Sequence, residues 1–405
     1  MRFIHEISRL AGIEYRDHAM KFEVTSMKNE RQITRRSWLR TAGGASVLAA
    51  GSPQIFAQGA SLRNPMVAQV VDSSTQTQDI SKDFVVGSRT AWQEINAAGG
   101  LRGQTIRHNI IQTDGSAAEM NTAWAQLRND SSCVASFGTC ADTLAAALTA
   151  QSREGNSELV HAAPWLQNAS VELGAQTFSI FSTREQQIQH ALRNMTTVGV
   201  DKLMVVYQSA DERRQNMPDI QRMAQSLKLT LQEMPVQADL SAQASQISRT
   251  STPLVLFVGG TPELVQFMRG WNPGVTLRYI IALADVNLQT AQQMMGNRHV
   301  PVIGTQAVPV VSGSLAVVRR YRQALAKYYD EPPTALSLAG YLSARYTAQV
   351  LQNVRGNLNR SAAFEAFSRR PPVDLEGFRV TYNNGKLQSA YVTQSMLSAD
   401  GRLIG

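Results

Sequence analysis

Hydrophobic positions between residues 66 and 114 switch from strand spacing to helical spacing and back. One face of the predicted helix carries apolar residues at helical spacing: Phe84, Ala91, Trp92 and Ile95. Gly87 and Ser88 place small side chains on the same face, so the helix can lie close to a sheet. Residues 96–100 end the helix, because glycine adopts the left-handed conformation at little cost. With strands predicted at 66–71 and 105–112, this stretch is a first βαβ unit of a parallel sheet.

The same alternation of strands and helices continues along the chain. Residues 202–207 and 254–258 are apolar runs without polar alternation, as expected of strands that are covered on both faces. The other predicted strands are 133–138, 159–163, 178–181, 229–234, 279–283 and 302–304. The predicted helices are 117–129, 142–152, 186–198, 215–227, 242–250 and one opened by Thr261 as N-cap with Pro262 at the first helical position.

The last third of the chain has a different pattern. It predicts two long helices, at 315–329 and 336–354, and short strands at 378–382 and 390–394 around an Asn-Asn-Gly turn at 383–385. We therefore expect an α/β fold of two doubly wound, Rossmann-like lobes.

The N-terminal 57 residues have the order of an export signal. Arg35 and Arg36 lie in a sequence, TRRSWLR, that resembles the twin-arginine motif. A short apolar run follows, and residues 55–57 resemble a cleavage site ending at Ala57. The apolar run is too short to span a bilayer, and no cysteine follows it to carry a lipid. Met27 is an alternative start that gives a more compact signal. We expect an exported protein without direct membrane insertion.

Charge and motifs exclude several function classes. The chain of 405 residues has a formal net charge of +8, but beyond residue 57 it holds 30 basic and 26 acidic residues. No basic run with interleaved aromatic residues follows, so nucleic-acid binding is not expected. The sequence contains no catalytic or phosphate-binding motif and no pair of histidines at metal-ligand spacing. Cys133 and Cys140 are predicted too far apart for a disulfide. We expect no enzyme activity, cofactor or metal.

Several local sequences, in order, resemble those of type I periplasmic solute-binding proteins, particularly those serving branched-chain amino acid ABC importers. The resemblance covers residue 64 to the C-terminus. It is carried by EINAAGG at 94–100, FGT at 137–139, GVDKLMVVY at 199–207, GTQAVP at 304–309, LAGYLSAR at 338–345, LEGF at 375–378 and DGR at 400–402. The resemblance implies two lobes joined by a multi-strand hinge, with a ligand between them at the carboxyl ends of the strands. The first lobe is then expected to hold residues 62–182 and 310–370, and the second residues 183–309 and 371–405.

In the first lobe, the resemblance implies that the turn after the third strand binds a ligand carboxylate. Gly138 ends that strand, and backbone N–H groups of Thr139, Cys140 and Ala141, with the Thr139 hydroxyl, are expected to hold the anion. The alternative is that Thr139 simply caps the helix. Ala163 and Trp165 follow the next strand. The indole is expected either to cover an apolar ligand group or to pack under the loop.

In the second lobe, Tyr207, Gln208 and Gly260 lie at strand ends that would face the cleft. Asp285 ends a further strand and is expected either to pair with a ligand ammonium or to cap the following helix.

The hinge departs from the family pattern. Where relatives often carry an arginine and an acidic residue, this chain has Phe181 and Gln187, with Arg184 between them. Arg184 either supplies the charge for a ligand carboxylate or forms a salt bridge on the hinge surface.

These observations predict a periplasmic component of an ABC importer that binds a small polar ligand, an amino acid or a related carboxylate, by hinge closure. Its expected partners are that ligand and an inner-membrane permease, and the protein is expected to be a monomer. The alternative is a periplasmic ligand-sensing subunit that feeds a signalling receptor. Fold alone does not separate the two.

Overall fold

A computed structural model describes residues 64–155, 157–250, 252–272, 278–296, 300–398 and 403–404. The predicted export motif at Arg35 and Arg36, the cleavage site at Ala57 and the DGR sequence at 400–402 lie outside the described residues. The export route therefore stays a prediction.

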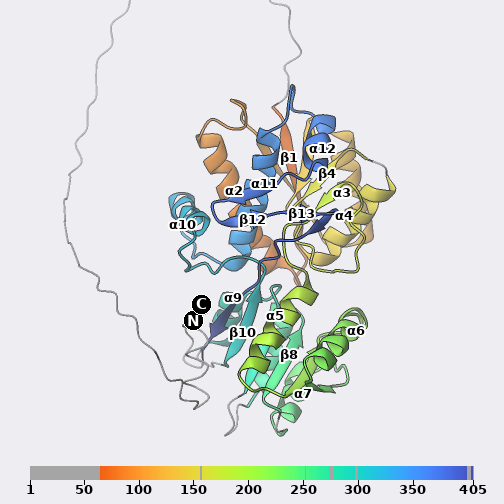
Figure 1. Cartoon of the computed structure of the whole chain (residues 1–405), viewed down its shortest axis with the longest axis vertical. Helices are drawn as coiled ribbons and strands as arrows, with labels where there is room; N and C mark the ends of the chain where they lie inside the picture. Colours follow the sequence, from red (N-terminus) through yellow and green to blue (C-terminus); the bar gives the residue numbers. More distant parts are fainter. Residues whose placement is uncertain are drawn as a thin grey trace, which may run out of the picture. The chain divides into compact units, whose positions relative to one another are not determined.

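The first lobe is built on a five-stranded, all-parallel sheet in the order β2-β1-β3-β4-β5 (Figure 1). Its strands are β1 Met66–Asp72, β2 Arg107–Thr113, β3 Cys133–Phe137, β4 Val160–Ala162 and β5 Thr177–Phe178, and the helices between them are α2 Gln78–Ala97, α3 Ala117–Asn129 and α4 Asp142–Glu154. The predicted first βαβ unit is confirmed. Its helix starts at Gln78, whereas the apolar stripe in the sequence begins only at Phe84.

Alternate side chains of β1 point to opposite faces of the sheet, as the geometry of a strand requires. Val67 and Val71 pack in the core under α2. Met66, Ala68 and Val70 pack on the other side, under α3 and α4. Every residue of β1 is buried, which explains why its sequence is apolar without alternation.

Three helices from the last third of the chain belong to the first lobe (Figure 1). They are α10 Ala316–Tyr328, α11 Ala335–Gln352 and α12 Arg360–Ser368, of which α12 was not predicted. The backbones of α2 and α11 lie in close contact. A Cβ atom added to Gly87 would lie 1.6 Å from the Ser337 carbonyl oxygen, and one added to Gly340 would lie 1.9 Å from the Phe84 carbonyl oxygen. Only glycine fits at these two positions.

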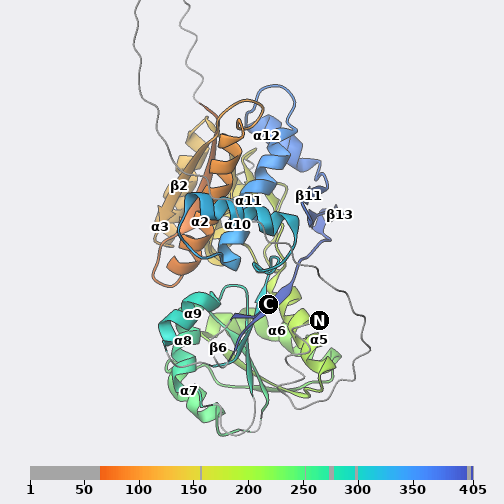
Figure 2. The same cartoon turned by 90° about the vertical axis from the view of Figure 1, so that its left-hand side faces the viewer.

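The second lobe is built on a seven-stranded sheet in the order β16-β15-β10-β9-β8-β6-β7, with β6–β10 parallel (Figure 2). Its parallel strands are β6 Lys202–Tyr207, β7 Thr230–Glu233, β8 Leu254–Val258, β9 Tyr279–Ala282 and β10 Val302–Gln306. Its helices are α5 Arg184–Thr197, α6 Ala210–Ser226, α7 Leu240–Ile247, α8 Thr261–Gly270 and α9 Leu288–Met295. In Figure 2, α7, α8 and α9 lie on one face of this sheet, and a continuous apolar core joins them to it.

The starts of α6 and α8 differ from the prediction because of their N-caps. Helix α6 begins at Ala210, five residues before the predicted start, because Ser209 accepts a hydrogen bond from the Glu212 N–H and caps it. The N-cap of α8 is Gly260, not Thr261. The Thr261 hydroxyl instead accepts a hydrogen bond from the Asn287 N–H at 3.0 Å.

The C-terminal segment crosses between the lobes later than residue 371, the expected boundary. Its strands are β11 Val373–Leu375, β12 Phe378–Val380, β13 Tyr382–Asn383, β14 Lys386–Leu387, β15 Thr393–Leu397 and β16 Leu403–Ile404. The Asn384-Gly385 turn joins β13 to β14, not to the later strand. Apolar residues up to Tyr391 pack on the first-lobe core, whereas β15 pairs antiparallel with β10. We therefore propose a boundary just before β15.

We expect Gly340→Ala to lower the free energy of unfolding by about 1–3 kcal/mol, because the new methyl group meets the α2 backbone and both helices must move apart. Alanine is a better helix former than glycine, so helix propensity alone predicts that the substitution raises the free energy of unfolding. Urea denaturation followed by circular dichroism measures the change. Gln349→Ala, at an exposed position of α11, is the control and should stay within about 0.5 kcal/mol of the parent.

Candidate functional site

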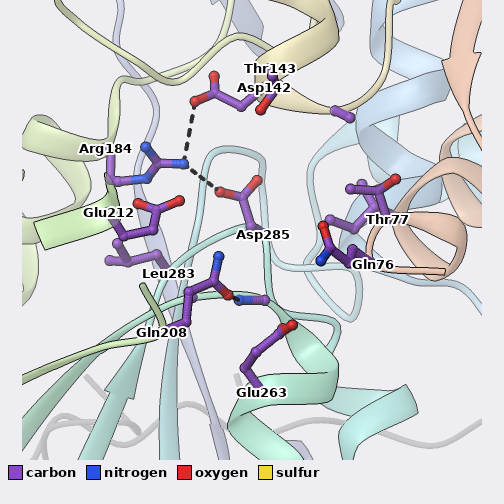
Figure 3. A pocket seen from close by; sticks show the side chains of 14 residues that line it. Gln76, Thr77, Asp142, Thr143, Arg184, Gln208, Glu212, Glu263, Leu283 and Asp285 are labelled. Atoms are coloured by element: carbon purple, nitrogen blue, oxygen red, sulfur yellow. Dashed lines mark hydrogen bonds and ion pairs between the residues drawn. The ribbon is translucent and has the colours of Figure 1, made fainter. Parts of the chain in front are cut away.

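A cavity of about 140 Å³ lies where loops of both lobes meet (Figure 3). In each sheet the strand order reverses beside the first strand, between β1 and β3 in the first lobe and between β6 and β8 in the second. Ligands of open α/β sheets bind outside the carboxyl ends of the strands at such a switch point. The cavity is lined by loops that follow all four of these strands, and by the end of β9: Gln76, Thr77, Ile80, Ala141, Asp142, Thr143, Arg184, Gln208, Glu212, Gly259, Gly260, Glu263, Leu283 and Asp285.

Arg184 is the central charged residue of the cavity wall. Its guanidinium contacts Asp285 at 2.9 Å, within the second lobe, and Asp142 at 3.3 Å, across to the first lobe (Figure 3). Only 7% of the Arg184 surface is exposed. Burial opposes its charge, but the two carboxylates outweigh burial and raise the pKa of Arg184. The interaction is therefore a buried ion triad that joins the lobes.

Asp285 makes two further contacts with the first lobe. Its Oδ1 accepts hydrogen bonds from Trp165 Nε1 at 3.0 Å and from Gln167 Nε2 at 2.5 Å. Gln187, which is fully buried on α5, donates to the Gln167 side chain and accepts from the Ala284 N–H at 2.9 Å. Neutral side chains thus extend the triad into a continuous polar network. Both carboxylate oxygens of Asp285 accept hydrogen bonds from donors of the protein itself.

Several carboxyl groups at the cavity have a raised pKa. Burial raises the pKa of Asp142, more than Arg184 lowers it, and Asp285 adds to the rise. Burial also raises the pKa of Glu212, with further contributions from Asp285 and Asp142. Asp79, in the first turn of α2, has a pKa raised mainly by burial, and its Oδ2 has no hydrogen-bond partner. Four carboxyl groups and one guanidinium line the cavity, so acidic groups are in excess there.

Five of the sequence-predicted site residues line the cavity: Ala141, Arg184, Gln208, Gly260 and Asp285. The Gln208 Oε1 accepts a hydrogen bond from the Gly260 N–H at 2.8 Å, which fixes the loops after β6 and β8 to each other. The other six do not line it: Gly138, Thr139, Cys140, Ala163, Trp165 and Tyr207.

Thr139 and Cys140 face the first-lobe core instead of the cavity. Gly138 and Ala141 both have positive φ, 54° and 86°, so the chain makes an extended turn before α4 starts at Asp142. The Thr139 hydroxyl shares a hydrogen bond of 2.8 Å with buried His161, and the Cys140 N–H donates to the Val70 carbonyl at 3.1 Å. Thr139 does not cap α4 either, because its N-cap is Ala141.

Aromatic side chains near the site are structural. Trp165 is 1% exposed and packs against Phe84 and Phe181, with ring centroids 5.8 Å and 4.9 Å away. Of its two expected roles, packing under the loop is the observed one. Tyr207 is also buried, and its hydroxyl lies in the electrostatic range of Glu233 and Arg213, away from the cavity.

Two further alternatives have a clear outcome. Asp285 does not cap the next helix, because α9 begins at Leu288 and Asn287 is its N-cap. Arg184 forms the predicted salt bridge, but in the buried wall of the cavity and not on the hinge surface.

Sequence reasoning missed the acidic lining residues Asp142, Glu212 and Glu263, together with Gln76, Thr77, Ile80, Thr143 and Leu283. A signal for the acidic ones exists. Asp142, Glu212 and Glu263 each occupy the first turn of a helix that directly follows a strand ending at the cavity. Acidic residues are common in the first turn of any helix, because they interact favourably with the helix dipole. They indicate a site only when the strand order shows which helices begin at the cavity.

The sequence of residues 66–397 matches the periplasmic binding protein family. The chain belongs to this family, in its type I fold. The match spans both lobes and every residue that lines the cavity. Members of the family bind solutes and are not enzymes, and the family implies a periplasmic location. No curated protein is similar enough in sequence to be matched.

Solved structures of this binding-protein fold superpose over most of the chain. An extracellular ligand-binding receptor from Verminephrobacter eiseniae is 20% identical with a TM-score of 0.76, covering 84% of this chain and 100% of its own. A fatty acid ABC transporter substrate-binding protein from Thermomonospora curvata is 15% identical, with a TM-score of 0.72 and coverages of 84% and 90%. The branched-chain amino acid transporter substrate binding protein LivJ from Streptococcus pneumoniae, in complex with isoleucine, is 15% identical, with a TM-score of 0.66 and coverages of 82% and 100%. At these identities they establish the fold alone.

Within the described parts of this binding protein, no helix is long and apolar enough to cross a membrane. The same residues contain no group of three or more His, Cys, Asp or Glu side chains placed to hold a metal ion.

We expect Arg184→Gln to lower the free energy of unfolding by about 3–5 kcal/mol at pH 7, because it leaves Asp142 and Asp285 buried without a cation. The deficit should shrink at acidic pH, because Asp142, whose pKa is raised, takes up a proton there and loses its charge. Urea denaturation at pH 7 and at acidic pH measures this.

Arg214→Gln is the matched control, since Arg214 pairs with Asp211 on the exposed surface of α6. It should change stability by less than about 1 kcal/mol at either pH. Equal losses in the two variants would show that the triad adds nothing beyond a surface ion pair.

Proposed function

We propose that this protein is the substrate-binding component of an ABC importer and captures a small polar ligand in the cavity between its lobes. The observation that carries the proposal is the lining of that cavity by loops from both switch points. A ligand there contacts both lobes at once. The expected ligand, an amino acid or a related carboxylate, rests on the family resemblance alone.

The mechanism we propose is hinge closure with a population shift. Three segments cross between the lobes, after β5, after β10 and before β15. A ligand held by both lobes favours the conformation in which both sets of contacts form. The closed conformation is then the one that presents the two lobe faces to an inner-membrane permease. No cofactor takes part, and a monomer is sufficient.

We expect a compound that binds in the cavity to stabilise the mature protein by about 2.7 kcal/mol at a hundredfold excess over its Kd. A thermal-shift screen against amino acids, small carboxylates, amides and amines finds such a compound. Gln208→Ala should reduce the shift, because Gln208 lines the cavity. Tyr207→Phe is the control: this neighbouring hydroxyl has no partner and does not line the cavity.

Two results would count against the proposal. One is a screen in which no compound stabilises the protein. The other is a binder whose shift is the same in Gln208→Ala as in the parent, which places its site elsewhere. A strain lacking the gene should also lose uptake of the radiolabelled binder.

We further propose export through the twin-arginine route with cleavage near Ala57. The double substitution Arg35→Lys and Arg36→Lys should leave the precursor in the cytoplasm, since the route reads both arginines. Immunoblots of periplasmic and cytoplasmic fractions measure the distribution. Arg40→Lys, outside the pair, should be exported and cleaved normally. Mature protein in the periplasm of the double variant would rule out this route.

A further inference from the structure

The cavity between the lobes has an unbalanced charge. Its lining residues include four carboxylates and one guanidinium: Asp142, Glu212, Glu263 and Asp285 against Arg184. Asp79, in the first turn of α2, adds a further partly buried carboxyl group that interacts with Asp285. The location of the site rests on the switch points and the cavity, not on this charge. The charge instead indicates which class of ligand the cavity binds.

The only cation among the lining residues is already used. Arg184 holds Asp285 at 2.9 Å and Asp142 at 3.3 Å, and it is 7% exposed. Both ion pairs use Arg184 Nη2, so a ligand carboxylate that paired with the rest of the guanidinium would be a third anion beside one cation, close to Asp142 and Asp285. Arg184 is therefore a poor anchor for a carboxylate.

The helix N-termini at the cavity offer little to an anion. Each of α4, α6 and α8 has an acidic residue in its first turn, namely Asp142, Glu212 and Glu263. A carboxylate in the first turn offsets the positive end of the helix dipole. At α6 the Glu212 N–H donates to the Ser209 hydroxyl, and in the loop before α8 the Gly260 N–H donates to Gln208. No side chain caps α4 or α8, so their first N–H groups lie beside the carboxyl groups of Asp142 and Glu263 in the same turns. Among the charged lining residues, acceptors outnumber donors.

We infer, resting on the solute-binding function proposed above, that the ligand is a small organic cation, an amine or amidine without a carboxylate. Glu212 and Glu263, in the first turns of α6 and α8, are the carboxylates placed to receive its charged group (Figure 3). Ile80 and Leu283 supply apolar wall for its carbon chain. A volume of about 140 Å³ suits a molecule near the size of benzene, which a cavity of about 150 Å³ accommodates.

The titration of the site agrees with this assignment. The pKa values of Asp142 and Glu212 are raised by burial and by their mutual repulsion with Asp285. A bound cation lowers the energy of the ionised forms, whereas a bound anion raises it further. A bound cation therefore stabilises the ionised forms of these carboxyl groups.

Matched pairs of compounds test the inference, each pair being an amine and the amino acid that differs from it by one carboxylate. The pairs are 1,5-diaminopentane with lysine, 4-guanidinobutylamine with arginine, and 3-methylbutylamine with leucine. Calorimetric titration of the mature protein at pH 7.5 and low salt gives Kd for each. We expect at least one amine to bind about tenfold or more tightly than its amino acid.

Glu212→Gln supplies the second arm. It should weaken binding of that amine by about tenfold and leave the far-ultraviolet circular dichroism spectrum unchanged. Asp211→Asn is the matched control, because Asp211 is the adjacent acidic residue of the same helix turn but is exposed and does not line the cavity. It should leave Kd unchanged.

The outcomes separate this inference from the function on which it rests. If amino acids bind as tightly as their amines, or more tightly, the protein is still a solute-binding protein and the cation assignment is wrong. Equal weakening by Glu212→Gln and Asp211→Asn also overturns it, since a general surface potential then explains the preference. If no member of any pair binds, the cation assignment fails and the solute-binding function must be sought with the wider screen.

Discussion

The buried ion triad of Arg184, Asp142 and Asp285 is the interaction on which the arrangement of the site depends. Placing three charges in a region with little water is costly, and the triad persists because each charge has a partner and each carboxylate also accepts neutral donors. The same pairing decides the chemistry around it. Since two carboxylates already compensate the charge of Arg184, carboxyl groups outnumber cations among the residues that line the cavity by four to one.

The topology explains why these residues meet at all. Both sheets reverse their strand order beside their first strand, so each lobe opens a crevice at the carboxyl ends of two neighbouring strands. Residues from widely separated parts of the chain, Gln76, Ala141, Gln208 and Gly260, follow these four strands and line one cavity. The family match over residues 66–397 and the shared fold of distant relatives place the molecule among solute-binding proteins. Its own side chains then determine the ligand.

The lobes could be predicted from the sequence because strand and helix periods are local. Strands 202–207 and 254–258 and helix 117–129 were predicted with the bounds the structure shows. The site was predicted only in part, because side-chain direction depends on conformations that residue type does not reveal. Ala141, a non-glycine residue, has a positive φ, and in the turn that it forms the Thr139 side chain faces the core. Likewise, the pairing of Asp285 with Trp165 and Gln167 exists only where two lobes meet, over more than a hundred residues of chain.

The late return of the C-terminal segment has a mechanical consequence. Residues up to Tyr391 pack with the first lobe and Thr393 begins the strand that pairs with β10, so the third connection between the lobes is only a few residues long. Two lobes connected by one segment can rotate freely about it. Three short connecting segments side by side allow the lobes to bend about one axis and oppose twisting. We therefore expect the closure proposed above to bend about one axis, with the register of the two lining surfaces kept by the connections.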